Sequence, residues 1–215
     1  MNEMTTPAPD SNAADVTSIK ALEEIYGAPV PRSLTKEIDH ISDHYRQFIE
    51  AAPFVVVATV GPEGLDSSPR GDPAGFMRVT DEKTVMMPDR RGNNRLDSLR
   101  NIVHDPHVAL LFTIPGSGNT MRIQGRAEIS VDPDLLGTFA IDGKAPRCVL
   151  VVTVDAIYFQ CARAVLRADL WNADKHVDPK SLPSAGTMLA QTSDGRIGGA
   201  DYDKAWPARA KTSMW

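Results

Sequence analysis

The chain has 215 residues, which is enough for one domain with a sizeable core and some additional segments. Its formal net charge of -5 argues against general binding to nucleic acid or to anionic membranes, because both require a positive field. No apolar stretch approaches the roughly 20 residues that are needed to cross a bilayer. The N-terminus lacks the basic region and the apolar region that together form a secretion signal. We therefore expect a cytoplasmic protein without a nucleic-acid or membrane partner.

The first part of the chain is predicted to be a tail followed by helices. Residues 1–17 are rich in small and polar residues without periodicity, which is typical of a disordered tail. A short helix is expected over 19–26 and a second helix over 35–50. Apolar residues recur at alternating spacings of four and three and predict one buried stripe, formed by Leu34, Ile38, Ile41, Tyr45 and Phe48. We expect residues 18–53 to form helices that pack on the following domain.

The pattern changes to that of a β domain over residues 54–171. The segment FVVVATV at 54–60 is apolar and β-branched, which is typical of a strand buried on both faces. Further extended segments are expected over 65–79 with an interruption, 84–88, 107–115, 120–131 and 147–160, and short helices over 95–103, 133–141 and 162–171. Strand and helix do not alternate, so we predict a mainly β, α+β fold in which about six antiparallel strands close into a small barrel. Residues 172–215 are predicted to be a C-terminal extension.

The main candidates for a binding site lie between residues 67 and 100. This segment has seven basic and five acidic residues, a basic excess in an acidic chain. The sequence GNN at 92–94 immediately precedes a predicted helix, and the free N–H groups of a helix start, with nearby guanidinium groups, form a phosphate site. Arg70 stands beside Gly71, where backbone and side chain can approach one ligand together. For GNN the alternative is a solvated loop before a capped helix. For Arg70 the alternative is a turn with a surface salt bridge.

Other residues of catalytic type form weaker patterns. His40 and His44 are four apart on one face of a predicted helix, but no third ligand accompanies them, so we predict a surface or interface pair and no metal site. Cys148 and Cys161 do not form a CxxC pair and are expected to be free thiols. Both are expected to have packing roles, Cys148 in an apolar run. No hydrolytic GxSxG motif occurs, and no catalytic residue is assigned.

Four segments occur in an order that points to a known family. They are PFVVVATVGPEGLDSSPRGD at 53–72, MMPDRRGNNRLDSLRNIVHDPHVALLFTIPG at 86–116, MRIQGRAEIS at 121–130 and CARAVLRADLW at 161–171. Together they resemble the FMN-binding branch of the pyridoxamine 5'-phosphate oxidase-like superfamily, and in particular a subgroup with SPRGD and PDRxGNNR segments. The resemblance covers about residues 21–171.

The resemblance implies a split β-barrel homodimer with FMN in clefts at the dimer interface. It implies seven flavin contacts: Ser68 and Arg70 in the cleft wall, Asn93, Asn94 and Arg95 at the phosphate, and Arg167 and Trp171 beside the cofactor, from the same or the other subunit. The last two are four apart on a predicted helix, so a cation–π or packing pair is an equal alternative for them.

The function that the resemblance implies is that of an FMN-dependent oxidoreductase acting on a small molecule, with NADH or NADPH as a candidate electron donor. Oxidases of pyridoxamine phosphate carry an Arg-rich C-terminal motif that binds the substrate phosphate. This chain ends in ARAKTSMW, so that activity is not expected. Three alternatives stay open: a non-catalytic flavin carrier or sensor, a deazaflavin (F420)-dependent reductase, and a barrel that acts only through protein contacts.

Overall fold

The structure, a computed structural model, describes residues 15–214 of the chain. It divides into two compact units, the first ending at Lys36 and the second beginning at Glu37. The first unit contains the helices α1 (Ile19–Tyr26) and α2 (Pro31–Thr35). The helix predicted over 19–26 is confirmed, whereas most of the predicted tail lies outside the described residues.

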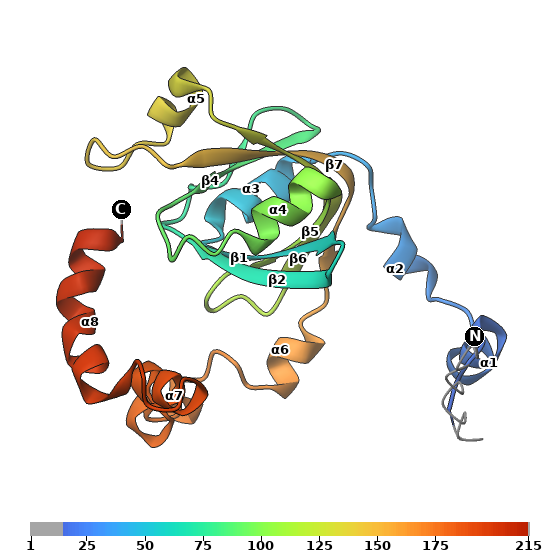
Figure 1. The fold of residues 1–215 in the computed structure, drawn as a ribbon. Helices are drawn as coiled ribbons and strands as arrows, with labels where there is room; N and C mark the ends of the chain where they lie inside the picture. Colours follow the sequence, from blue (N-terminus) through green and yellow to red (C-terminus); the bar gives the residue numbers. More distant parts are fainter. Residues whose placement is uncertain (1–14, 215) are drawn as a thin grey trace, which may run out of the picture. The chain divides into compact units, whose positions relative to one another are not determined.

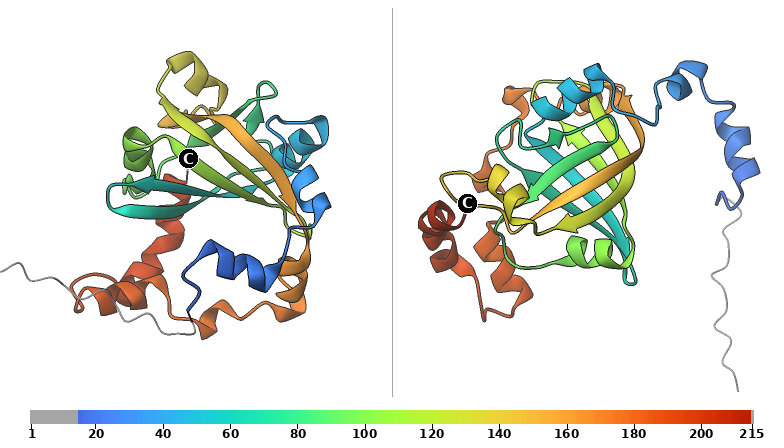
Figure 2. Two further views of the ribbon diagram at one scale, coloured as in Figure 1. Left: turned by 90° about the vertical axis from the view of Figure 1, so that its right-hand side faces the viewer. Right: turned by 90° about the horizontal axis from the view of Figure 1, so that it is seen from above.

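The second unit is built on one antiparallel sheet of seven strands (Figure 1). Their order across the sheet is β2-β1-β5-β6-β7-β4-β3, so β2 and β3 form the two edges. The strands are β1 (Phe54–Gly61), β2 (Gly64–Gly71), β3 (Arg78–Val79), β4 (Thr84–Asp89), β5 (His107–Thr113), β6 (Thr120–Ser130) and β7 (Cys148–Gln160). They curl around a common interior, as in a barrel (Figure 2). The mainly β fold is confirmed, with one strand more than predicted because the interrupted segment at 65–79 forms both β2 and β3.

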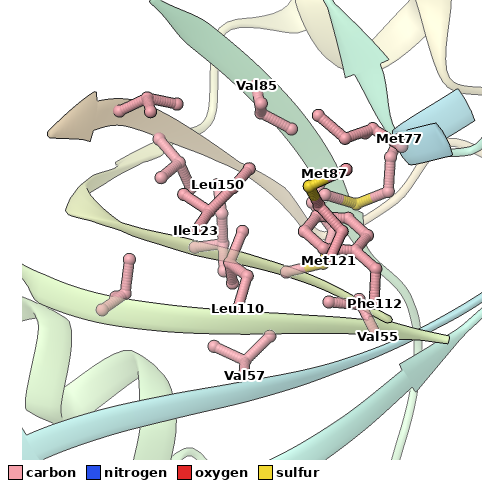
Figure 3. Packing of buried hydrophobic residues seen from close by; sticks show 14 of the residues in the cluster. Val55, Val57, Met77, Val85, Met87, Leu110, Phe112, Met121, Ile123 and Leu150 are labelled. Carbon is pink, nitrogen blue, oxygen red and sulfur yellow. The ribbon is translucent and has the colours of Figure 1, made fainter. Parts of the chain in front are cut away.

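Side chains that alternate along the strands fill this interior (Figure 3). In β1 the inward residues Val55, Val57 and Thr59 are at most 2% exposed, while the alternate positions are half-buried or exposed. Buried side chains from other strands complete the core, among them Val85, Met87, Leu110, Phe112, Met121, Ile123 and Leu150. The expectation that β1 is buried on both faces is therefore wrong for the single chain, because the chain covers only its inner face.

Short helices flank the barrel: α3 (Asp43–Ala51), α4 (Asp97–His104), α5 (Pro133–Thr138) and α6 (Arg163–Arg167). In Figure 2 α3 and α4 lie at opposite ends of the barrel. The helix α3 contacts β3 and β6, and α4 contacts β1, β2 and β6. Both helices bury apolar residues against the sheet, with Ile49 and Ile102 at most 5% exposed. The two helices therefore close the ends of the core.

The helix predicted over 35–50 is wrong in its first half. The helix α3 begins at Asp43, because Ser42 is its N-cap and the Ser42 Oγ accepts a hydrogen bond from the Tyr45 N–H at 3.4 Å. Upstream, Ile38 is extended and exchanges two backbone hydrogen bonds with Ile157 of β7, at 3.1 and 2.8 Å. Strand pairing replaces helix here, and His40 does not share a helical face with His44.

The extension after residue 171 contains two helices that the sequence pattern did not predict, α7 (Ala185–Thr192) and α8 (Gly199–Ser213). The carboxylate of Asp203 in α8 joins them, because it accepts hydrogen bonds from the Ser184 Oγ at 2.5 Å and the Gly186 N–H at 2.8 Å. No helix within residues 15–214 is long and apolar enough to cross a membrane.

Replacement of Phe112 by alanine tests the core. The side chain is fully buried at the centre of the sheet, so we expect the Phe112→Ala change to lower the free energy of unfolding by about 3–5 kcal/mol. Urea denaturation followed by circular dichroism measures this. The matched control is Leu65→Ala, because Leu65 is 87% exposed and its loss should change the stability by less than about 0.5 kcal/mol. Equal losses in the two variants would contradict the assigned core.

Candidate functional site

A cleft of about 570 Å³ lies where the ends of β2 and β4 meet the loop that leads into α4. Four of the residues singled out from the sequence line it: Arg70, Asn93, Asn94 and Arg95. Other lining residues include Asp72, Phe76, Asp89, Arg90, Arg91, Leu96, Ser98, Leu99 and Arg147. Five arginines against two aspartates make this cleft basic in an acidic chain.

Two reciprocal ion pairs form one wall of the cleft. Arg70 at the end of β2 lies with its Nε 3.3 Å from the Asp89 Oδ1 at the end of β4. Two residues further along the first segment, the Asp72 Oδ2 accepts a hydrogen bond from the Arg90 Nε at 2.7 Å. Arg90 also donates from Nη1 to the carbonyl of Phe139 at 2.8 Å. Each segment therefore gives one cation and one anion to the other.

Burial makes these pairs electrostatically important. The Asp72 side chain is only 1% exposed and that of Arg90 only 14%. Burial also raises the pKa of the Asp89 carboxyl, while the charge of Arg70 opposes that rise. A buried ion that loses its partner is strongly destabilising, because water no longer solvates the remaining charge. The two pairs should therefore hold the cleft wall in one arrangement.

Two polar atoms of this wall lack a hydrogen-bonding partner among the described residues. They are the Arg70 Nε, whose contact with Asp89 is not aligned for a hydrogen bond, and the Asp72 Oδ1. Both are buried, and buried polar atoms are usually satisfied by protein, water or ligand. The wall thus has an unused donor and an unused acceptor, which fits a ligand that offers polar groups of both kinds.

The loop before α4 supplies the polar floor of the cleft. The Asn93 side chain binds the backbone of its own loop, because its Oδ1 accepts a hydrogen bond from the Arg95 N–H at 2.9 Å. Asn94 has a φ of 58°, in the left-handed region that asparagine tolerates. The helix α4 begins at Asp97 with Leu96 as its N-cap and without a side-chain capping bond. An asparagine therefore does not cap the helix, and the first N–H groups of α4 have no side-chain acceptor at the cap.

The remaining charges near this loop are arranged around α4. The Arg95 guanidinium is exposed and pairs with the carboxylate of Asp97, two residues further on, which raises the pKa of Arg95. Ser98, in contrast, is buried and donates from its Oγ to the Asp66 Oδ2 at 2.6 Å. Arg95 can therefore swing to an anion in the cleft at the cost of an exposed ion pair, which contributes little to stability.

The other predicted site residues lie outside the cleft of this chain. Ser68 contacts a lining residue, since its Oγ accepts a hydrogen bond from the Arg70 Nη1 at 2.5 Å. Arg167 is exposed at the end of α6. Trp171 donates from its Nε1 to the carbonyl of Ser117 at 2.7 Å. Ser68 thus supports a cleft residue, and Arg167 and Trp171 are not brought to the cleft by the chain that carries them.

Sequence reasoning missed several lining residues, namely Asp72, Asp89, Arg90, Arg91 and Arg147. A signal existed for the first four, since RGD at 70–72 and DRR at 89–91 carry opposite charges in mirrored order. Arg147 gave no such signal, because only the pairing of β4 with β7 brings it to the site.

Neither cysteine lines the cleft. Cys148 pairs with Asp89 across β7 and β4 and is buried, as expected. Burial and the Asp89 charge raise the pKa of its thiol to about 11, so it stays protonated at neutral pH. Cys161, for which a packing role was expected, is exposed. Within residues 15–214, no group of three or more His, Cys, Asp or Glu side chains could hold a metal ion.

Replacement of Asp72 by alanine tests the reciprocal ion pairs. The change leaves the Arg90 charge buried without its partner, so we expect a loss of about 3 kcal/mol in the free energy of unfolding. Asp155→Ala is the matched control, because Asp155 pairs with Arg126 at 2.9 Å on the surface, where such pairs contribute less than about 1 kcal/mol. Chemical denaturation of both variants measures the free energy of unfolding. If Asp72→Ala loses no more stability than Asp155→Ala, the Asp72–Arg90 pair does not hold the wall of the cleft.

Several solved structures match part of this chain. Among solved structures, HupZ of Group A Streptococcus is 20% identical, with a TM-score of 0.44 over 54% of this chain and 91% of that chain. General stress protein 26 of Bacillus anthracis is 18% identical, with a TM-score of 0.41 over 53% and 88%. A related protein of the pyridoxinephosphate oxidase family from Clostridium acetobutylicum is 14% identical, with a TM-score of 0.42 over 55% and 86%.

The search of curated proteins finds no match. The family described as pyridoxamine 5'-phosphate oxidase, however, matches residues 41–161, which is more than half of the chain and includes all seven strands of the barrel. On this match, the chain belongs to the pyridoxamine 5'-phosphate oxidase family.

Proposed function

We propose that the cleft binds FMN and that the protein is an FMN-dependent oxidoreductase acting on a small molecule. The observation that carries the proposal is the basic cleft beside the start of α4, in a chain with a net charge of -5. A phosphate requires such a place, because N–H groups and guanidinium groups both stabilise its charge. The unused donor on Arg70 and the unused acceptor on Asp72 also fit a flavin, which carries hydrogen-bonding groups of both kinds.

In this proposal the loop Asn93–Arg95 holds the phosphate, and the wall with Arg70 holds the rest of the cofactor. Bound FMN would supply hydride and electron transfer, and the protein would supply binding, orientation and electrostatics. Arg70 is fixed by Ser68 and Asp89, so its charge stays at one place in the cleft. A fixed cation beside a flavin favours its reduced, anionic form.

Replacement of Arg95 tests the cofactor assignment. Arg95→Ala removes one charge-assisted contact to the phosphate, so we expect FMN affinity to fall roughly ten- to a hundred-fold. The visible absorption of the purified protein and chromatography of the ligand released by heat measure the bound FMN. Arg126→Ala is the control, because Arg126 is paired with Asp155 and does not line the cleft. Unchanged FMN affinity in Arg95→Ala would contradict the assignment.

The same measurement separates the alternative functions. Release of a deazaflavin would replace the chemistry and keep the fold. Bound FMN that neither NADH nor NADPH reduces would favour a carrier or sensor. A protein that takes up no flavin would leave a barrel that acts through protein contacts, and the proposed site would fail.

We further propose that the protein is a homodimer with the flavin at the interface. The outer face of β1 and β5 is apolar and only half-buried in the single chain, with Val56 paired to Leu111 and Ala58 paired to Ala109. Exposed apolar faces of this kind commonly mark protein contacts. Arg167 and Trp171, which do not line the cleft of their own chain, would then lie beside the cofactor held by the second copy.

A charge on the outer face of β5 tests the dimer. We expect Leu111→Glu to convert the protein from dimer to monomer, because a buried carboxylate at an apolar interface would be unpaired. Sedimentation velocity of the full chain measures the mass. The control is Val131→Glu, since Val131 is 66% exposed just beyond β6 and should tolerate the charge. A wild-type monomer, or a dimer that survives Leu111→Glu, would refute this interface.

A further inference from the structure

Three of the five arginines in the cleft already have acidic partners. Arg70 pairs with Asp89 and Arg90 with Asp72, while Arg95 pairs with Asp97. In the proposed function Arg95 also faces the flavin phosphate. The charges of these three side chains are therefore accounted for.

The other two arginines of the cleft, Arg91 and Arg147, are different. Neither guanidinium forms an ion pair or a hydrogen bond with any of the residues 15–214, and both are exposed at the cleft. Their positive charges have no acidic partner in the described part of the chain, whereas each of the other three arginines of the cleft is paired with an aspartate.

Strand pairing places Arg147 beside the segment that carries Arg91, and both residues line the cleft. Asp89, the last residue of β4, pairs with Cys148, the first residue of β7, and its carbonyl accepts a hydrogen bond from the Arg147 N–H at 2.9 Å. The next positions beyond the paired strands are Arg90 and Arg147, with Arg91 one residue further on. Like charges on facing positions of neighbouring strands repel. Asp72 neutralises only Arg90, so this end of the cleft would be stabilised by a bound anion.

We infer that Arg91 and Arg147 bind the anionic group, a carboxylate or a phosphate, of the small molecule that reacts with the flavin. The inference rests on the proposed function, which assigns the flavin phosphate to the loop Asn93–Arg95 and leaves these two cations for a second ligand. Guanidinium groups present planar donors that match carboxylate and phosphate oxygens. The substrate is thus a small organic acid or phosphate ester.

The test is a titration of the FMN-loaded, full-length protein with acetate and, separately, with inorganic phosphate. Bound anions next to a flavin change its visible absorption, and we expect saturable binding of at least one of the two anions with a Kd near or below about 1 mM. Preference for acetate would indicate a carboxylate substrate, and preference for phosphate would indicate a phosphate ester.

Two variants decide which residues are responsible. Arg147→Gln and Arg91→Gln should each weaken the anion roughly tenfold or more and leave the FMN content unchanged. The control variant Arg126→Gln should retain wild-type anion binding. If Arg147→Gln loses FMN instead, Arg147 belongs to the flavin site and the inference is overturned. It is also overturned if the wild-type protein binds neither anion, or if both variants bind as the wild type does.

Failure of the proposed function has a separate readout. If the wild-type chain takes up no FMN, the flavin assignment fails. Calorimetric titration of the same chain with inorganic phosphate then still decides the arginine site, because its heat of binding does not require a flavin. Binding that disappears in Arg147→Gln supports the anion site, and its absence in the wild type refutes it.

Discussion

The rest of the site depends on the two reciprocal ion pairs between the segments at 70–72 and 89–90. In the sheet, β2 forms one edge and β4 lies next to the other edge, so the two strands are separated by four others along the hydrogen-bonded order. The ion pairs join them directly, because each segment carries one arginine and one aspartate whose side chains are largely shielded from solvent. They thus connect the two sides of the curled sheet at one end of the barrel.

This connection also creates the cleft. The wall between β2 and β4 retains one unused donor on Arg70 and one unused acceptor on Asp72, and the loop before α4 completes the cavity. Ion pairs are directional, whereas apolar contacts are not, so the pairs define the position of the arginines more closely than core packing alone would. A ligand that binds here binds only the folded chain and should stabilise the folded state by mass action.

Four of the site residues predicted from the sequence line one cleft, but the sequence did not show how the cleft is built. Arg70 and the loop Asn93–Arg95 were identifiable because their residue types have a local meaning, as a cation beside glycine and as a polar turn before a helix. Ser68 was predicted in the cleft wall; it does not line the cleft of the single chain, and its Oγ accepts a hydrogen bond from Arg70. Arg147 is 77 positions from Arg70 and carries no local pattern, so its role depends on the register of β4 against β7. Arg167 and Trp171 were identified through a motif whose purpose the single chain does not reveal.

The sequence by itself determined the mainly β fold, the positions of most strands and the helix at 19–26, because β-branched runs, turn residues and caps act on the backbone within a few residues. Only the tertiary structure decided that α3 begins at Asp43, since Ile38 gains backbone hydrogen bonds to β7 that no local pattern encodes. It likewise decided that only one face of β1 is covered by the chain's own core, and that two of the five cleft arginines, Arg70 and Arg90, meet two aspartates across the barrel. Burial and charge pairing depend on which distant segments meet. The physical reason is that the energies of burial and of ion pairing come from contacts between side chains far apart in the sequence, not from the local preferences of neighbouring residues.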